Sequence, residues 1–215
     1  MKKVAVVLSG CGVYDGAEIH EAVLTMLAIV KQGGEYQVFA PDIYQHHVIN
    51  HTNGEEMAEK RNVLIEAARI ARGDISDMKL YSPESFDALI FPGGFGAAKN
   101  LCNWAFKGPD CKVNDDVAKA IKSTLAADKP IGAMCIAPVI LGKLLGDIEI
   151  TIGADLADAA MVEKMGSKHC STGHGDVIRD SKYKIFTAPC YMLDGSILDI
   201  AVGTENLVRE MLKEA

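Results

Sequence analysis

The sequence predicts an α/β domain built on a doubly wound, flavodoxin-like and mostly parallel sheet with helices on both faces. Two observations favour this fold class. Short, continuous apolar runs, typical of strands buried on both faces, alternate with amphipathic segments of helical period. In addition, no internal repeat or linker divides the 215 residues. We therefore expect a single domain over residues 1–215, large enough to bury roughly 70% of its unfolded surface.

The first part of the chain alternates strand and helix. Val4–Leu8 is an apolar run bounded by charge and glycine, which predicts a buried strand. A glycine-rich loop at 9–16 follows it. Residues 17–32 carry apolar side chains at helical spacing and end at a glycine pair, so we predict a helix there. The run 36–40 predicts a second strand, which Pro41 stops.

The middle of the chain repeats this alternation. Residues 41–56 show no clear period, 57–72 predict a helix, and a polar segment follows to Phe86. Residues 87–91 predict a third buried strand. After a Pro-Gly-Gly turn, the next predicted elements are helices at 97–106 and 113–127 and a strand that ends at Met134.

The last part of the chain completes the pattern. Residues 148–152 predict a fifth strand and 154–165 a helix. Two shorter β runs, at 176–179 and 183–187, predict a small hairpin insertion. A long helix over about 192–213 closes the chain. Strands and helices that alternate at this spacing imply a parallel sheet.

Composition limits the classes of function. The formal net charge of −7 argues against a general nucleic-acid binder or a protein of anionic membranes. Six cysteines form no CxxC pair and match no zinc spacing, which favours free thiols in a reducing compartment. The start of the chain does not resemble a signal peptide, and no apolar run reaches 18 residues. The protein is therefore predicted to be cytoplasmic.

Residues 129–138, Lys-Pro-Ile-Gly-Ala-Met-Cys-Ile-Ala-Pro, place one cysteine between a predicted strand and a predicted helix. A thiol in this setting feels the positive end of the helix dipole, which lowers its pKa and raises the thiolate fraction. Cys135 is therefore the candidate nucleophile. The alternative is that Cys135 is a small buried apolar residue, as free cysteines usually are.

Two glutamates at the start of the first predicted helix lie at the same sheet edge as Cys135. If burial kept its carboxyl group protonated, Glu18 or Glu21 could donate a hydrogen bond to the thiolate. The alternative is that both are first-turn charges that favour the helix dipole. His20, between them, is either a proton shuttle or an exposed helix residue.

The turn Pro92-Gly93-Gly94 carries little side-chain bulk, so its backbone N–H groups can approach a substrate closely. The N–H groups of Gly94 and of Ile136, the residue after the cysteine, could form an oxyanion hole with two donors. A tight turn that requires positive φ would explain the same glycines.

A nucleotide site is a further interpretation of the first loop. Gly10, Gly12 and Gly16, with Asp42 after the second strand, resemble a dinucleotide fingerprint. The third glycine is one residue late, however, and the glutamates at the helix start would repel a pyrophosphate. We therefore expect no nucleotide cofactor.

Three histidines in the segment after the second predicted strand suggest a metal site. His46, His47 and His51 lack a matched carboxylate or cysteine spacing, which favours surface residues. We therefore expect no metal ion and no other cofactor.

Three motifs carry a resemblance that runs along nearly the whole chain. They are Ser-Gly-Cys-Gly-Val-Tyr-Asp-Gly-x-Glu-Ile-His-Glu at 9–21, Phe-Pro-Gly-Gly-Phe-Gly-Ala-Ala-Lys-Asn-Leu at 91–101 and Met-Cys-Ile-Ala-Pro at 134–138. They resemble the ElbB-like group of the ThiJ/PfpI superfamily, which has the class I glutamine amidotransferase-like fold. The resemblance implies that Cys135 is the elbow cysteine and Gly94 part of the oxyanion turn. It also implies that Glu21 is the partner of the thiol, with Glu18 as second choice.

The same resemblance implies a function. It suggests a cofactor-independent, glyoxalase III-like lyase that converts glyoxal or a similar small aldehyde to a hydroxy acid such as glycolate. The activity would be weak and linked to isoprenoid biosynthesis, and the protein would be a homodimer.

The chain also departs from the pattern of many relatives. Ile136 stands where many of them have a histidine, which leaves Cys135 without the usual base for acyl transfer. An amidotransferase also needs a late His-x-Glu pair, and the nearest match is His174-Gly-Asp176 in a predicted loop. The alternative function is therefore a non-enzymatic redox-sensing or regulatory binding protein that uses the same thiol.

Overall fold

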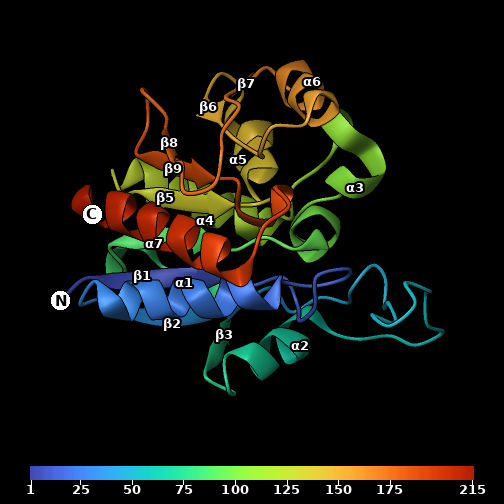
Figure 1. Ribbon diagram of the computed structural model, residues 1–215. Coiled ribbons are helices and arrows are strands. Elements are labelled where there is room, and N and C mark those ends of the chain that lie inside the picture. Colours follow the sequence, from blue (N-terminus) through green and yellow to red (C-terminus); the bar gives the residue numbers. More distant parts are fainter.

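Figure 1 shows a computed structural model that describes residues 1–215. Its central sheet has seven strands in the order β3-β2-β1-β4-β5-β9-β8, and β8 alone runs antiparallel to its neighbour. These strands are β1 Lys3–Val7, β2 Glu35–Ala40, β3 Ile75–Asp77, β4 Ala88–Phe91, β5 Ile131–Met134, β8 Ile178–Arg179 and β9 Ile185–Ala188. The predicted doubly wound, mostly parallel α/β fold is confirmed.

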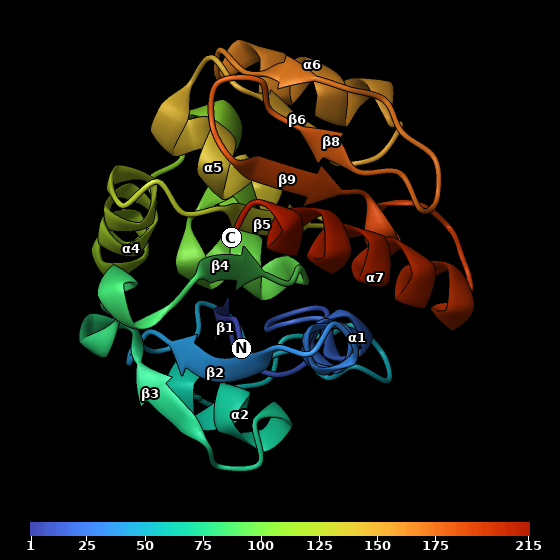
Figure 2. The same ribbon diagram turned by 90° about the vertical axis from the view of Figure 1, so that its left-hand side faces the viewer.

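Helices cover both faces of the sheet. They are α1 Ile19–Lys31, α2 Val63–Ile70, α3 Trp104–Lys107, α4 Asp115–Ala126, α5 Pro138–Leu145, α6 Leu156–Lys164 and α7 Ile197–Lys213. Figure 2 shows α1 and α7 together on one side of the sheet and α4 and α5 on the other. No helix combines the length and the apolar composition that crossing a bilayer requires.

The alternation of side chains along the strands builds two cores. In β1, Val4 and Val6 join the core beneath α1 and α7, whereas Ala5 and Val7 join the core beneath α4 and α5. All four residues have no exposed surface. This two-sided burial explains why the strands read as continuous apolar runs in the sequence.

The C-terminal strands differ from the prediction. The hairpin is no insertion, because β9 pairs in parallel with β5 and so extends the central sheet, while β8 forms its edge. The predicted fifth strand is the short β6 Glu149–Ile150, which pairs with β7 Lys168–His169 in a separate two-stranded sheet. All four residues of β9 are buried, and β9 rather than the strand predicted over 148–152 lies next to β5 in the central sheet.

Smaller differences concern the middle of the chain. The helix predicted over 57–72 begins only at Val63, where the Asn62 side chain caps it by accepting from the Ile65 N–H at 3.0 Å. The segment predicted as polar and irregular contains β3. The helix predicted over 97–106 is divided into a turn of π-helix, Ala97–Leu101, and the short α3.

The order of the strands creates a crevice at one edge of the sheet. The chain runs from β1 outward through β2 to β3 and then returns to β4 on the other side of β1. Such a change of direction is where open α/β sheets bind ligands, beyond the carboxyl ends of the strands. Both chain ends lie at the left in Figure 1, so this edge is on the opposite side of the molecule.

Candidate active site

Cys135 sits on a strained turn between β5 and α5. Its φ is +58°, a left-handed conformation that is uncommon for a residue with a side chain. Its backbone N–H donates to the Ala188 carbonyl at 3.0 Å, which fixes the turn against the end of β9. The residue is only 7% exposed. A reactive side chain on a sharp strand-to-helix turn is the arrangement of a nucleophile elbow.

Glu21, on the first turn of α1, is fully buried beside this elbow. Its Oε2 accepts from the Gly93 N–H at 2.9 Å and its Oε1 from the Tyr191 N–H at 3.1 Å. The Cys135 thiol lies next to this carboxyl group, since a Cβ atom at Gly93 would lie 2.8 Å from its Sγ and 2.7 Å from Oε2 of Glu21. Burial raises the pKa of the Glu21 carboxyl to about 7, although hydrogen bonding from Tyr191, Gly93 and Cys135 favours the ionised form. At neutral pH this carboxyl group can therefore both take up and release a proton.

The predicted low pKa of the Cys135 thiol is wrong. Burial raises this pKa well above its usual value, and the negative charge of Glu21 raises it further. Hydrogen bonding from the N–H groups of Gly94 and Ile136 opposes both effects without cancelling them. The helix dipole argument fails here because removal from water outweighs the partial charge of a helix terminus.

Gly93 and Gly94 allow the three segments of the site to meet. A Cβ atom at Gly93 would lie 2.4 Å from the Cβ of Cys135 and 2.7 Å from Oε2 of Glu21. At Gly94, where φ is +92°, a Cβ would lie 2.3 Å from the backbone nitrogen of Glu18. Both distances are far below van der Waals contact, so neither position accommodates a side chain. The turn after β4 can lie against the Cys135 elbow only because Gly93 and Gly94 have no side chains.

Glu18 and His20 occupy different places from Glu21. Glu18 is the N-cap of α1, and its Oε2 accepts from the Glu21 N–H at 2.7 Å. It therefore positions the helix start. His20 is exposed, and its Nδ1 lies 2.8 Å from the Tyr191 hydroxyl, which links it to a residue at the Cys135 cavity.

The first loop does not form a phosphate site. The Glu18 carboxylate occupies the N-cap position of α1, where a bound phosphate would sit in a dinucleotide fold. Asp42, the candidate ribose acid, accepts from the Asn62 side chain at 2.7 Å. The protein's own side chains thus satisfy the groups that a dinucleotide would need.

The histidines are engaged in packing and hydrogen bonds. The His46 ring packs on Phe106 at 4.1 Å between centroids, and His51 Nε2 accepts from the Tyr14 N–H at 3.2 Å. His174 Nε2 lies 3.0 Å from the Asp194 carbonyl and does not line the Cys135 cavity. No group of three or more metal-binding side chains lies close enough to hold an ion.

A cavity of about 450 Å³ opens over the elbow. Cys135, Ile136 and Gly94 form part of its wall. Eleven of its fourteen lining residues are hydrophobic, and they include four aromatic side chains. Glu21 lies behind this wall, because it is fully buried and does not line the cavity.

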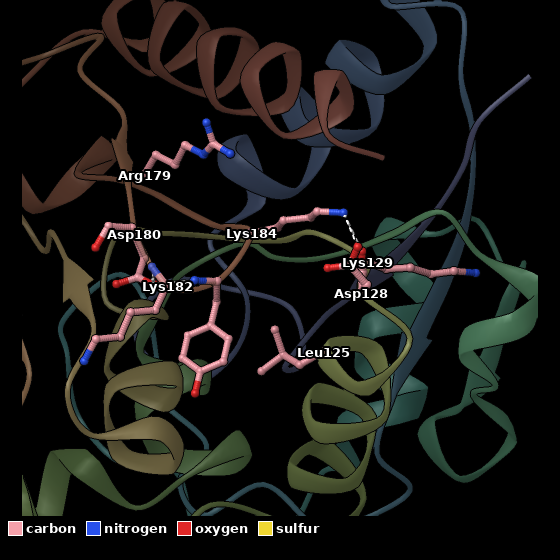
Figure 3. Close-up of a pocket in the computed structure, with 9 residues that line it drawn as sticks. Leu125, Asp128, Lys129, Arg179, Asp180, Lys182 and Lys184 are labelled. Atoms are coloured by element: carbon pink, nitrogen blue, oxygen red, sulfur yellow. Dashed lines mark hydrogen bonds and ion pairs between the residues drawn. The ribbon is translucent and has the colours of Figure 1, made fainter.

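A second cavity, of about 200 Å³, lies near the amino ends of β5 and β9 and is lined by several basic residues (Figure 3). Each of these cations already has a partner. Lys184 meets Asp128, Lys182 meets Asp147, Arg179 meets Glu214, and Lys129 donates to two backbone carbonyls. This cavity therefore offers no free positive charge to an anionic ligand.

Tyr191 is a residue of the site that the sequence does not predict. Tyr191 holds Glu21 through its N–H and reaches His20 through its hydroxyl. It follows Cys190, a second buried cysteine with positive φ, at the end of β9. The signal that could have found it is the pairing of β9 with β5, which brings residues 189–192 to the edge of Cys135.

Comparisons with known proteins give close relatives, although no family model matches the chain. The chain is 45% identical over 221 residues to the "ES1 protein homolog, mitochondrial" of Rattus norvegicus, covering 98% of this chain and 83% of that protein. It is also 45% identical to the human "Glutamine amidotransferase-like class 1 domain-containing protein 3, mitochondrial", covering 98% of this chain and 82% of that protein.

Solved structures agree with these relatives. An "isoprenoid biosynthesis protein with amidotransferase-like domain" from Ehrlichia chaffeensis superposes with a TM-score of 0.92 at 34% identity, covering 100% of this chain and 99% of that one. Glyoxalase III from Candida albicans superposes with a TM-score of 0.58 at 17% identity, covering 97% and 96% of the two chains. At that identity the second comparison supports the fold alone.

The relatives also correct one prediction. The rat, human and zebrafish proteins are all named as mitochondrial, which contradicts the cytoplasmic location predicted from composition and free cysteines. The physical reason is that import receptors recognise short address segments. The composition of the folded domain therefore does not reveal its compartment.

Proposed function

The chain belongs to the ES1/ElbB-like group of the DJ-1/ThiJ/PfpI superfamily, and from this membership we propose that it is a cofactor-independent, glyoxalase III-like enzyme. Its reaction would convert glyoxal, or a similar small reactive aldehyde, to a hydroxy acid. The observation that carries the proposal is the contact between a buried carboxyl group of pKa about 7 and the thiol of a strained cysteine. Such a pair can exchange a proton in a site that excludes water.

The proposed reaction begins with a proton transfer from Cys135 to Glu21. This transfer removes the negative charge that raises the pKa of the thiol, so thiolate and protonated carboxyl form together. The thiolate attacks one aldehyde carbon of glyoxal, a C–S bond forms and the carbonyl electron pair moves to oxygen. The N–H groups of Gly94 and Ile136 would hold this oxyanion.

An internal redox step follows. Glu21 first gives its proton to the oxyanion and so becomes a carboxylate again. It then takes the proton from the carbon bound to sulfur and returns it to the neighbouring carbon, while the hydroxyl proton of the first carbon moves to the oxygen of the second. The first carbon is thereby oxidised to a thioester and the second reduced to an alcohol. Water then attacks the thioester, the C–S bond breaks and glycolate leaves. One glyoxal and one water give one glycolate and a proton, so no external oxidant or cofactor is needed.

The test is glycolate formation from glyoxal by the purified protein. Cys135→Ser is expected to abolish turnover, and Glu21→Gln to lower kcat by about 100-fold or more. Cys190→Ser is the matched control, because Cys190 is also buried with positive φ but does not line the cavity. Equal rates in all four proteins would rule out the proposed reaction.

The alternative function, a redox-sensing protein, has less support. Thiols that sense peroxides are exposed and have a low pKa. Cys135 is buried and burial raises its pKa, so little thiolate would be available to an oxidant. As a biological setting for the enzyme we propose isoprenoid biosynthesis, the process named for the Ehrlichia relative.

We also propose a homodimer formed through α1. Ile19, Val23, Leu27 and Val30 follow one face of this helix at helical spacing, and each is between 42% and 54% exposed. These residues contribute to the helical spacing of apolar side chains in the sequence, but they do not face the core. The buried face of α1 instead contains Glu21, Ala22, Thr25, Met26, Ala28 and Ile29. An exposed apolar stripe on a helix is typical of a contact surface.

A further inference from the structure

The cavity at Cys135 is much larger than glyoxal. Its volume of about 450 Å³ falls in the range of sites that enclose drug-sized ligands, whereas glyoxal has four non-hydrogen atoms. A molecule of that size would contact the elbow and leave most of the cavity to water. Water is a poor occupant of an apolar cavity, so the shape of the site favours a larger substrate.

The far wall of the cavity is apolar and is built by segments outside the elbow. Trp104 and Phe106 come from α3, Met161 from α6, and Tyr191 and Met192 from the turn after β9. The end of α3 and α6 lie against each other, since a Cβ at Gly108 would be 3.9 Å from the Met161 sulfur. This wall offers a hydrophobic surface to whatever part of a substrate extends away from Cys135.

Charge narrows the class of ligand. No lysine, arginine or histidine lines the cavity, so a phosphate or carboxylate on the substrate would have no cationic partner. Asp158 is the single lining residue with an ionisable carboxyl group, and its charge would repel an anion. An uncharged apolar group therefore fits the cavity better than the phosphorylated or acidic part of a metabolite.

We propose that the preferred substrate is a 2-oxoaldehyde, R–CO–CHO, in which R is an uncharged aromatic, alicyclic or branched alkyl group. This inference rests on the proposed function, since it assigns the substrate class of the same thiol. The aldehyde carbon lies at Cys135 and R lies between Trp104, Phe106 and Met161. The chemistry balances as for glyoxal: R–CO–CHO and water give R–CH(OH)–COO⁻ and a proton.

The same wall explains release of the product. The reaction turns a neutral substrate into a carboxylate, and the cavity contains no cation to hold it. Repulsion by Asp158 adds to this effect when Asp158 is ionised. We expect the 2-hydroxy acid to inhibit only weakly.

The first experiment compares kcat/KM for glyoxal, methylglyoxal and cyclohexylglyoxal, with Cys135→Ser as the background. We expect kcat/KM for cyclohexylglyoxal to exceed that for glyoxal by about ten-fold or more, since each apolar group buried in a pocket adds to discrimination. Equal values, or a preference for glyoxal, would overturn the substrate class while leaving the glyoxalase function intact.

Two variants test where R binds. Phe106→Ala and Met161→Ala are expected to lower the ratio of kcat/KM for cyclohexylglyoxal over glyoxal by about ten-fold. Leu156→Ala is the control, because Leu156 starts the same helix as Met161 but is 85% exposed and does not line the cavity. If the control shifts the ratio as much as the two variants, R does not bind at this wall.

A binding experiment separates this inference from the proposed function. Trp104 is the single tryptophan of the chain and lines the cavity, so its fluorescence reports on occupancy. We expect the unreactive cyclohexanecarboxamide to shift its emission with a Kd at least about ten-fold lower than acetamide or the charged cyclohexanecarboxylate. Saturable binding without any Cys135-dependent turnover would reject the enzyme and keep the ligand class. A flat titration with cyclohexanecarboxamide would reject the ligand class.

Discussion

Replacing Glu21 with glutamine is expected to change how the free energy of unfolding depends on pH. The pKa of the Glu21 carboxyl is about 7 in the folded protein, against an ordinary value of 4.5. Between these pH values the folded protein binds a proton at Glu21 that the unfolded chain has lost. Folding is therefore favoured most below pH 4.5, and this contribution is lost as the pH rises to 7 and beyond.

The size of the effect follows from the two pKa values. At about 1.4 kcal/mol for each tenfold change in proton affinity, the difference corresponds to about 3 kcal/mol of unfolding free energy. Glutamine does not titrate, so the variant lacks this dependence. Its amide can accept from only one of the N–H groups of Gly93 and Tyr191, and the loss of the other acceptor costs about 1–3 kcal/mol at every pH.

These two effects predict a crossing pattern. At pH 5 the Glu21→Gln variant should be less stable than the wild type. At pH 8 the difference should shrink or reverse, because the wild type alone has lost about 3 kcal/mol. Urea unfolding at 25 °C, followed by the fluorescence of Trp104 at pH 5, 6, 7 and 8, measures this directly.

An exposed carboxylate provides the control. Glu35→Gln removes a charge at an exposed position of β2 and should leave the pH profile parallel to that of the wild type. Parallel profiles for Glu21→Gln and the wild type would show that Glu21 does not carry a raised pKa. The argument for a shared proton at Cys135 would then fail.

Three further predictions concern the space, the thiol and the surface. Gly93→Ala should abolish glyoxal turnover and lower the free energy of unfolding by about 1–3 kcal/mol, because its Cβ would overlap Cys135 and Glu21. The control is Gly173→Ala, where a Cβ meets nothing closer than 3.6 Å. A Gly93→Ala enzyme that keeps its activity would contradict the packing argument. Peptide mapping should show that iodoacetamide alkylates Cys135 more slowly at pH 7 than the half-buried Cys170. Glu21→Gln should speed the alkylation of Cys135, because it removes the charge that raises the pKa of this thiol. Fast alkylation of Cys135 in the wild type would contradict the raised pKa. In sedimentation experiments, Leu27→Glu should convert the proposed dimer to a monomer. Leu80→Glu, at a position that is 72% exposed and lies outside α1, should leave the dimer intact. A monomeric wild-type protein would refute the interface.

Much of the fold could be predicted because its strands are buried on both faces. Val4–Leu8 and the run around Ile90 are continuously apolar and show no helical spacing, so only a buried strand explains them. The glycine-rich turns that follow them mark the sheet edge where the site forms. Strand β3 could not be found in this way, because its three residues are only partly buried and contain a single apolar side chain. The place of β9 beside β5 depends on tertiary pairing, which sequence period does not encode.

The sequence predicts where the site residues lie better than it predicts their chemical properties. Cys135 and the glycine turn stand at strand ends that the sequence shows, and the resemblance selected Glu21 over Glu18. The pKa of the thiol was predicted with the wrong sign, because it depends on how completely the neighbours exclude water. The cavity wall from α3 and α6 combines residues that are more than fifty positions apart, so no local motif announces it.

The backbone at Cys135 has a consequence for how this protein can change over time. A left-handed φ suits glycine and costs a residue with a side chain about 1 kcal/mol or more. Cys135→Gly would relieve that strain and would also remove the thiol. Selection for thermal stability alone would therefore favour glycine at position 135 and a more stable but inactive protein. Stability and reactivity therefore oppose each other at a single residue, Cys135.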